Sequence, residues 1–264
     1  MLLENKVAVI HGGGGSIGSV VAKTFAREGA KVYLAGRTRS RLDEVASAIN
    51  EAGGFARAAE VDALDRDAVN AYLAAVVREA GRVDLSFTAI GIPQEGIQGT
   101  ALLELSTESF MKPIETYAKS YFITATAAAR HMVQQRSGVI LVHTPEVSRL
   151  GIAFSGGMAP SWAAMETLNR NLSMELGQFG VRAVTLRSTG LPETKTIDVV
   201  YNLHAKALGI TKEQFQQFLE SMNHIKRSTT LKEVAEAAVF AASDRASSMT
   251  AATMNLTGGA VVDW

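Results

Sequence analysis

The chain has 264 residues, a formal net charge of +0 and no cysteine. The missing cysteine excludes disulfides, cysteine nucleophiles and thiolate metal ligands, and we expect no metal site. The balanced charge argues against nucleic acid as a partner. We find neither an apolar leader nor a run of roughly 18 apolar residues, so we expect no membrane segment. We therefore expect a cytoplasmic protein that acts on a small molecule and needs neither nucleic acid nor membrane.

Short apolar runs alternate with helical patterns along the chain. The apolar runs predict strands near residues 6–11, 31–36, 56–60, 83–89, 138–144, 181–187 and 252–257. The helical period predicts helices near residues 17–28, 39–52, 66–80, 107–135, 159–178 and 231–243. Such alternation with short links is typical of a parallel sheet with helices on both faces. The sequence thus predicts one doubly wound α/β domain, residues 1–264, with a seven-stranded parallel sheet.

A glycine-rich turn follows the first predicted strand. Residues 7–10 are apolar, residues 12–15 are four consecutive glycines, and a helical pattern begins directly afterwards. Strand, glycine turn and helix together are a dinucleotide-binding signature of the Rossmann type, in which the backbone and the helix N-terminus approach the pyrophosphate. Glycine also serves tight strand–helix turns for geometry alone. The turn residues expected at a cofactor are Gly12, Gly14, Ser16, Ile17 and Gly18.

The end of the second predicted strand carries a basic residue. In this fold an acidic residue there binds the ribose hydroxyls of NAD, and a basic residue accepts the 2′-phosphate of NADP. Arg37 therefore favours NADP(H) over NAD(H), although it could also be a solvated basic start to a helix. Asp62 follows the third strand and suits the adenine amine, or else it caps a helix together with Asp65.

The final crossover, residues 188–230, is longer than a simple link requires. It carries an extra helical pattern over residues 212–223. An insertion there lies at the carboxyl ends of the strands, where sheets of this kind bind ligands. We expect it to act as a substrate lid.

These motifs together resemble the short-chain dehydrogenase/reductase family over essentially the whole chain. The family's glycine pattern is matched by Gly12 and Gly18, while His11 takes the place of its threonine and Ser16 that of its middle glycine. Further similarity lies at residues 170–177, 180–184 and 256–259.

The resemblance implies a nicotinamide cofactor and a homo-oligomer, a tetramer or dimer, formed through the helices near 107–135 and 159–178. It places Ala89, Gly91, Gly190 and Thr194 at the cofactor. Trp162 and the alanine-rich run 125–129 would suit close contact between those helices.

The family's catalytic residues have no counterparts at the matching positions. The tyrosine place falls on Met158, the lysine place on Trp162, the serine place on Pro145 and the asparagine place on Tyr117. The chain has no lysine between residues 119 and 195 and no tyrosine between residues 121 and 201, so a small shift in register does not restore the pair. The sequence therefore predicts an atypical member without the usual Asn-Ser-Tyr-Lys set.

Glu146, Tyr117 and Thr144 are the candidates for catalysis. Glu146 stands at the mouth of the fifth strand, Thr144 lies beside the serine place, and Tyr117 is expected to face the site together with Tyr121. Glu146 and Tyr117 also have plainer interpretations: Glu146 as a solvated loop acid, and Tyr117 as helix packing with a satisfied hydroxyl. His143 is expected to point into a helix layer.

Two functions follow from these observations. The first is an NADP(H)-dependent oxidoreductase that reduces a small carbonyl, imine or enone compound by a mechanism without the tyrosine–lysine pair. The alternative is a catalytically silent member that acts as a cofactor-dependent binding or scaffold protein. A third, weaker hypothesis is that the chain binds no nucleotide, because Trp162 fills the nicotinamide-ribose pocket and Ser16 crowds the pyrophosphate.

Overall fold

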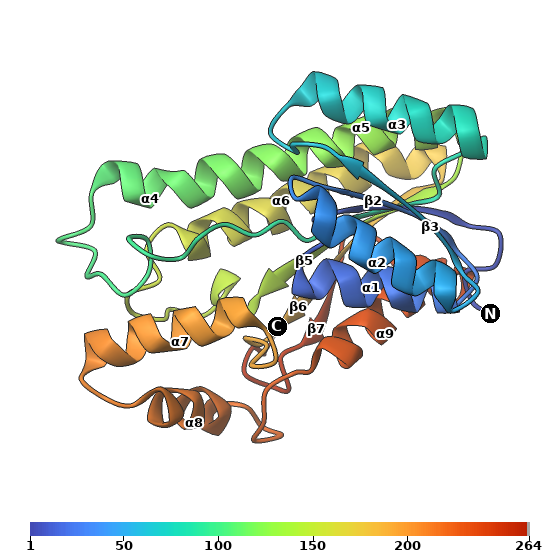
Figure 1. Cartoon of the computed structure of the whole chain (residues 1–264). Coiled ribbons are helices and arrows are strands. Elements are labelled where there is room, and N and C mark those ends of the chain that lie inside the picture. Colours follow the sequence, from blue (N-terminus) through green and yellow to red (C-terminus); the bar gives the residue numbers. More distant parts are fainter. Residues whose placement is uncertain (263–264) are drawn as a thin grey trace.

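The computed structural model describes residues 1–262, which form one parallel sheet with helices on both faces (Figure 1). The strand order is β3-β2-β1-β4-β5-β6-β7. The strands are β1 (Val7–His11), β2 (Lys31–Gly36), β3 (Phe55–Glu60), β4 (Leu85–Thr88), β5 (Gly138–Pro145), β6 (Val181–Ser188) and β7 (Ala252–Leu256). The predicted fold class and all seven strands are confirmed, with ends displaced by at most two residues.

Two helix layers enclose the sheet, one on each face. One layer consists of α1 (Ser16–Arg27), α2 (Arg39–Glu51) and α9 (Leu231–Ala242), and the other of α3 (Arg66–Ala80), α5 (Lys119–Gln135) and α6 (Met158–Leu176). Because strand side chains alternate between faces, Ala8 and Ile10 enter the first core while Val7 and Val9 enter the second. Burial on both faces explains why the strands appear in the sequence as continuous apolar runs.

The predicted helix 107–135 is interrupted. It consists of α4 (Thr107–Pro113), a π-helical turn (Ile114–Ala118) and α5. Pro113 lacks an N–H group, and its ring crowds the preceding helical turn. The wider π-helical turn that follows accommodates the lost hydrogen bond and the ring. The π-helical turn carries Tyr117, which lines the cavity at the ends of the strands.

Two helices, not one, lie between β6 and α9. They are α7 (Lys195–Leu208), which the sequence analysis did not predict, and α8 (Lys212–Met222), which it did. Thr194 caps the start of α7 and Gly209, at φ 68°, ends it. The two helices pack on each other through Tyr201, Ala205 and Phe215 and lie beside the carboxyl ends of the strands (Figure 1).

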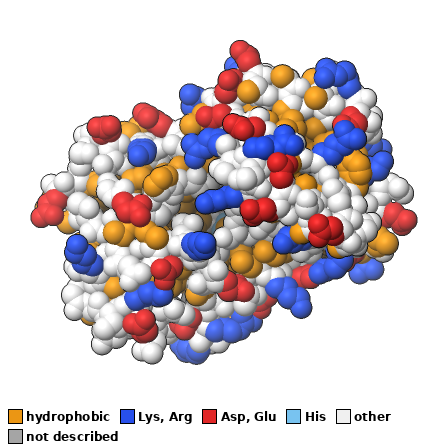
Figure 2. Space-filling view, viewed as in Figure 1, with side chains coloured by type: hydrophobic (Ala, Val, Ile, Leu, Met, Phe, Trp, Pro, Cys, Tyr) orange, Lys and Arg blue, Asp and Glu red, His pale blue; other side chains and the backbone are white. Residues whose placement is uncertain are grey.

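The alanine-rich run of α5 is placed differently from the prediction. Ala125, Ala127, Ala128 and Ala129 are buried in the chain's own second core, so they cannot supply contact to another subunit. Basic and acidic side chains are mixed over the face seen in Figure 2. Within residues 1–262, no helix is long and apolar enough to cross a membrane.

Candidate functional site

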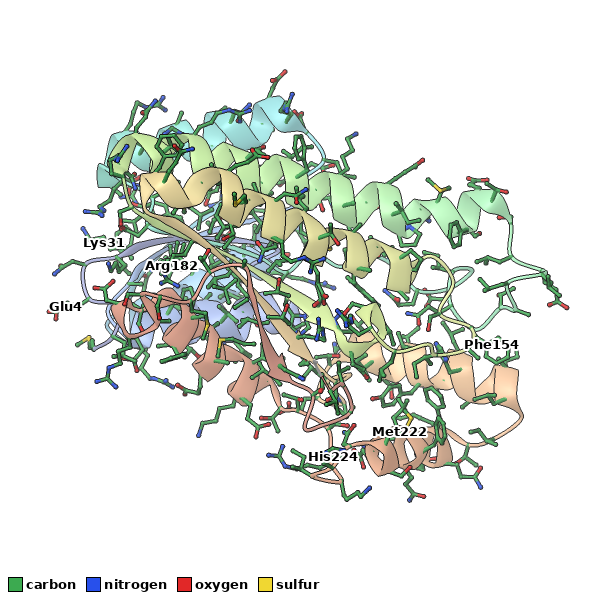
Figure 3. The ribbon with its side chains drawn as sticks, turned by 180° about the vertical axis from the view of Figure 1, so that it is seen from behind. Glu4, Lys31, Phe154, Arg182, Met222 and His224 are labelled. Carbon is green, nitrogen blue, oxygen red and sulfur yellow. The ribbon has the colours of Figure 1, made fainter. Side chains whose placement is uncertain are left out.

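A cavity opens at the carboxyl ends of the central strands. Its walls come from the segments that follow β1, β4, β5 and β6, together with α6, α7 and α8. The chain order reverses between β1 and β4, which is where doubly wound sheets bind their ligands. Seen from behind, the loop that carries Phe154 lies at the same end of the molecule as the two crossover helices (Figure 3).

The glycine turn is packed so closely that side chains cannot replace its key glycines. A Cβ atom on Gly12, at φ 83°, would lie 2.3 Å from the Ala89 carbonyl oxygen, and one on Gly18 would lie 2.3 Å from that of Gly12. No side chain caps the N-terminus of α1, so its first-turn N–H groups are left for another acceptor. By contrast, a Cβ on Gly91 would meet nothing, although Gly91 lines both the cavity and the hollow beside it. This cradle fits the phosphates of a dinucleotide.

A second hollow continues from the cavity toward β2 and β3. Gly14, Arg37, Arg41 and Asp62 line it. Asp62 accepts a hydrogen bond from the Leu64 N–H at 2.9 Å, whereas the helix that follows is capped by Asp65 alone. The hollow is therefore polar and basic on one side, as an adenosine phosphate requires.

His11, in the family's threonine place, is buried beneath the turn. Neither of its ring nitrogens has a hydrogen-bond partner. Burial lowers the pKa of His11 to about 4, so the ring is neutral near pH 7.

Glu146 is buried at the wall of the cavity and not solvated as a loop acid would be. It begins a short 3-10 turn after β5 and is 7% exposed. Its Oε1 atom accepts a hydrogen bond from the Gly190 N–H at 3.2 Å, and its Oε2 atom has no partner. Burial raises the pKa of Glu146 to about 7, against the smaller effect of backbone hydrogen bonds. A carboxyl with this pKa exchanges a proton readily near neutrality.

Tyr117 faces the cavity, where its ring packs against Trp162 at 5.7 Å between centroids. Burial raises the pKa of Tyr117 to about 12, so the phenol keeps its proton at neutral pH. Tyr121 does not line the cavity, because its hydroxyl contacts Asn169 inside the core. Met158 and Trp162 form part of the apolar wall, as their sequence positions predict.

Thr144 does not line the cavity. Its hydroxyl donates to Glu166 Oε1 at 2.8 Å, and the Ser148 hydroxyl donates to the same oxygen at 2.6 Å. Arg187 contacts both oxygens of Glu166, with Nη2 2.8 Å from Oε2. Burial alone would raise the pKa of Glu166, but the hydrogen bonds from Arg187, Ser148 and Thr144 hold it below the ordinary value. This buried cluster supports the turn that carries Glu146 from behind.

Several lining residues were missed or misplaced by sequence reasoning. His143 points into the cavity and not into a helix layer, with Nε2 2.8 Å from the Ser188 hydroxyl. Gln94, Gln98, Tyr201 and His204 also line it, and no motif marks them. Ser155 also lines the cavity and donates to the Ile152 carbonyl.

The predicted cofactor residues are brought together. Gly12 and Gly14 line the second hollow with Arg37 and Asp62; Ser16, Ile17, Gly190 and Thr194 line the cavity; Ala89 and Gly91 line both. Gly18 lines neither and supports the turn through its contact with Gly12. Within residues 1–262, no cluster of histidine and acidic side chains has the arrangement of a metal site.

Known proteins resemble this chain over nearly its full length. A family model described as enoyl-(acyl carrier protein) reductase matches residues 13–261. Secoisolariciresinol dehydrogenase of Forsythia intermedia is 30% identical over 97% of this chain and 89% of its own. NAD+-bound xylitol dehydrogenase superposes with a TM-score of 0.92 at 22% identity, covering 98% of this chain and 100% of its own. An actinorhodin polyketide ketoreductase with NADPH superposes with a TM-score of 0.88 at 23% identity, covering 97% of this chain and 97% of its own.

Fold and site therefore define an α/β oxidoreductase scaffold with a dinucleotide cradle. The chain belongs to the short-chain dehydrogenase/reductase family, whose members are oxidoreductases that bind nicotinamide cofactors.

Proposed function

We propose that this chain is an NADP(H)-dependent oxidoreductase that reduces a small carbonyl, imine or enone compound without the tyrosine–lysine pair of its family. The observation that carries the proposal is Glu146, a buried carboxyl with a pKa of about 7 and one unpartnered oxygen at the cavity. A bound nicotinamide cofactor supplies or accepts the hydride. Glu146 exchanges the proton with the substrate, a role for which its pKa is suited.

The other two catalytic candidates take different parts in this proposal. Tyr117, whose hydroxyl interacts with the Ile92 backbone and the Gln94 side chain and keeps its proton at neutral pH, contributes to the cavity wall beside Trp162. Thr144 acts as a positioning residue, because it reaches the site only through Glu166. Glu166 in turn holds Ser148, at the far end of the turn that Glu146 begins.

The cavity favours a compact substrate with an apolar body. Its volume is about 210 Å³, below the range of roughly 300–1,000 Å³ usual for drug-sized ligands. Ile152, Met158, Val200 and Leu219 contribute apolar walls. We propose that residues 188–230 form a lid that excludes water from the reacting atoms, since α7 and α8 contribute side chains to the cavity wall.

The cofactor is proposed to lie across both hollows, from the glycine turn to Gly190 and Thr194. Binding is tested by titrating NADPH and NADH against tryptophan fluorescence. Trp162 lines the cavity, and a Trp264→Phe variant removes the signal of Trp264, which lies outside the described residues. Consumption of bound NADPH on adding carbonyl, imine or enone compounds then tests hydride transfer. If neither nucleotide binds, the oxidoreductase proposal fails.

Replacing Arg37 with alanine is expected to weaken NADPH binding about tenfold to hundredfold and to leave NADH binding unchanged. The reason is the loss of a charge-assisted hydrogen bond to the 2′-phosphate, worth about 1.5–3 kcal/mol. Arg39→Ala is the matched control, because Arg39 pairs with Asp43 and does not line the hollow. Equal losses for both nucleotides in Arg37→Ala would contradict a 2′-phosphate contact.

Replacing Gly91 with alanine is expected to raise the dissociation constant of NADPH at least fivefold without lowering the melting temperature. A Cβ there meets no protein atom within 4 Å, so the added methyl obstructs only a bound ligand. Gly177→Ala, also with open space, at φ −57° and outside both hollows, controls for the backbone change. An unchanged NADPH affinity in Gly91→Ala would place the cofactor elsewhere.

A second candidate function is a catalytically silent cofactor-binding or scaffold protein. Met158 and Trp162 at the tyrosine and lysine places favour it, since neither side chain transfers a proton. Tight NADPH binding without hydride transfer to any compound class would support it. For the assembly we propose a cytoplasmic homo-oligomer, a dimer or tetramer, because Phe122 on α5 and Met174 on α6 are exposed apolar side chains.

A further inference from the structure

We propose that the cavity selects a cationic nitrogen compound: a compact ammonium whose N–H groups are bound by Glu146 and His204, or the iminium ion derived from it. This inference rests on the proposed function of the same site and narrows its substrate class. It is carried by the charge of the lining, by two buried acceptors without partners and by the aromatic walls.

In the described part of the chain, the cavity lining has one carboxyl group and no permanently charged basic side chain. Among the lining residues within 1–262, Glu146 is the single carboxyl, and no lysine or arginine is present. A charge in surroundings of low dielectric is costly unless an opposite charge accompanies it. A bound ammonium or iminium provides that charge for Glu146, while a carboxylate or phosphate substrate would find no counter-ion here.

The hydrogen-bond partners of His204 determine which of its nitrogens is free. The Ile92 carbonyl only accepts, and it takes a hydrogen bond from Gln94 Nε2 at 2.5 Å. Gln94 Oε1 is then free to accept from Gln98 Nε2 at 2.6 Å, which leaves Gln98 Oε1 facing His204 Nε2 at 2.9 Å. His204 Nε2 must therefore carry the proton, a tautomer assigned from this chain of partners.

The other nitrogen of His204 is consequently a bare acceptor. His204 is 2% exposed, and its Nδ1 atom has no partner, like Glu146 Oε2. Burial lowers the pKa of His204 to about 4, which keeps the ring neutral. Buried acceptors without partners are rare and costly. Two of them on one cavity favour a ligand that brings at least two hydrogen-bond donors.

Aromatic rings enclose the same space. Tyr117 and Trp162 pack together on one side, and on the other Phe215 contacts both Tyr201 and His204, with ring centroids 5.5 and 5.0 Å apart. The faces of such rings attract cations, with energies that increase on desolvation. A cation held in this cavity therefore lies among aromatic side chains.

A cationic substrate also accounts for a site without the tyrosine–lysine pair. In the reduction of an iminium ion, the hydride from the reduced nicotinamide forms a C–H bond at the iminium carbon. The π-electron pair of the C=N bond becomes the lone pair of a neutral amine, so the step needs no proton donor. In the opposite direction, Glu146 takes a proton from the ammonium nitrogen before the hydride leaves carbon.

The test uses tetrahydroisoquinoline, which is protonated at neutral pH, and isochroman, its neutral oxygen analogue. Each is titrated by calorimetry into the NADPH complex, where no hydride transfer is possible because ligand and cofactor are both reduced. We expect the amine to bind at least tenfold more tightly than isochroman. Glu146→Gln is expected to remove that preference while isochroman and NADPH bind as before. Glu104→Gln, which removes an exposed acid that does not line the cavity, is expected to preserve the preference for the amine.

His204→Phe provides the second variant. It keeps an aromatic ring beside Phe215 but removes the free Nδ1 atom. We expect it to weaken binding of the amine about threefold to tenfold more than binding of isochroman. Equal affinities of the two ligands for the unmodified protein, no amine binding, or an amine preference that survives Glu146→Gln would each overturn the inference. NADPH binding and hydride transfer to neutral carbonyls are measured separately, so failure of cation selectivity is distinguishable from failure of the proposed function.

Discussion

Replacing Glu146 with glutamine is expected to slow single-turnover oxidation of an amine, or reduction of a neutral carbonyl, about a hundredfold or more while leaving the affinity for NADPH unchanged. Glutamine keeps the size of the side chain, and its amide oxygen can still accept from the Gly190 N–H. It neither ionises nor exchanges a proton. Stopped-flow measurement of cofactor oxidation or reduction, compared with nucleotide titration, separates the two quantities.

The pH profile identifies the group responsible. Glu146 shares the cavity lining with His143 from β5 and with Tyr201 and His204 from α7, and it interacts electrostatically with Tyr201. Burial lowers the pKa values of both histidines to about 4 and raises that of Tyr201 far above neutrality. Glu146, at about 7, is therefore the group among these that titrates between pH 5 and 9.

The direction of the pH dependence follows from the form that reacts. Amine oxidation uses the carboxylate as base, so its rate rises as pH increases through about 7. Reduction of a neutral carbonyl uses the protonated acid, so its rate falls over the same interval. Both profiles should become flat in Glu146→Gln. An inflection near pH 7 that persists in the variant would assign proton transfer to another group.

A change in stability provides the control for misfolding. The folded-state pKa of Glu146, about 7, lies above its ordinary value of 4.5, so the folded state binds more protons between these values. Its contribution to the free energy of unfolding is therefore present below about pH 4.5 and is lost as pH rises through 7, by up to about 3 kcal/mol. Glu146→Gln should thus be more stable than the unmodified protein at pH 8 and lose that advantage toward pH 4.5, as thermal unfolding will show.

The elements of the sheet were predictable because burial imposes a period on the sequence. Strands such as β1 are covered on both faces and appear as apolar runs, and helices such as α1 bury one stripe, which includes Val21 and Phe25. These signals are local, so an isolated sequence contains them. The glycine turn was predictable for a related reason, because only glycine fits at Gly12.

The missed helix α7 has a physical explanation. It packs on the small cluster of Tyr201, Ala205 and Phe215 and not on the main core, so its apolar stripe is short. Its cap Thr194 and its terminal Gly209 were available as start and stop signals. The family resemblance assigns Thr194 to the cofactor, and the structure shows that the same residue caps α7.

The chemistry of the site could be predicted only in part. The position of Glu146 after β5 follows from the order of elements, but its burial depends on Gly190 and Tyr201, which are distant in sequence. Likewise, His204 and Gln98 are 106 positions apart, and their contact depends on a helix that the pattern did not indicate. Long-range packing, which sets protonation states, leaves no local signal in a single sequence.

Replacing Glu166 with glutamine is expected to lower the free energy of unfolding by about 3–5 kcal/mol. Its carboxylate accepts hydrogen bonds from Thr144, Ser148 and Arg187 within the core, and an amide presents donors where these groups require an acceptor. The side chains of Glu166 and Arg187 are 3% and 2% exposed, so water cannot replace what is lost. Urea unfolding of the variant, with Glu175→Gln on the exposed face of α6 as the matched control, measures the effect.

Glu166→Gln should also affect proton exchange at Glu146, because Glu166 binds Ser148, the last residue of the 3-10 turn that Glu146 begins. At a temperature where the Glu166→Gln variant remains folded, we expect slower hydride transfer and a displaced pH inflection, with NADPH affinity retained. The folded-state pKa of Glu166 is lowered, so its contribution to stability is present above its ordinary pKa and is lost as pH falls. The stability gap between Glu166→Gln and the unmodified protein should therefore narrow in acid. A stability gap independent of pH would show that the buried pair does not depend on ionisation. A pH inflection identical to that of the unmodified protein would show that the pair does not position Glu146.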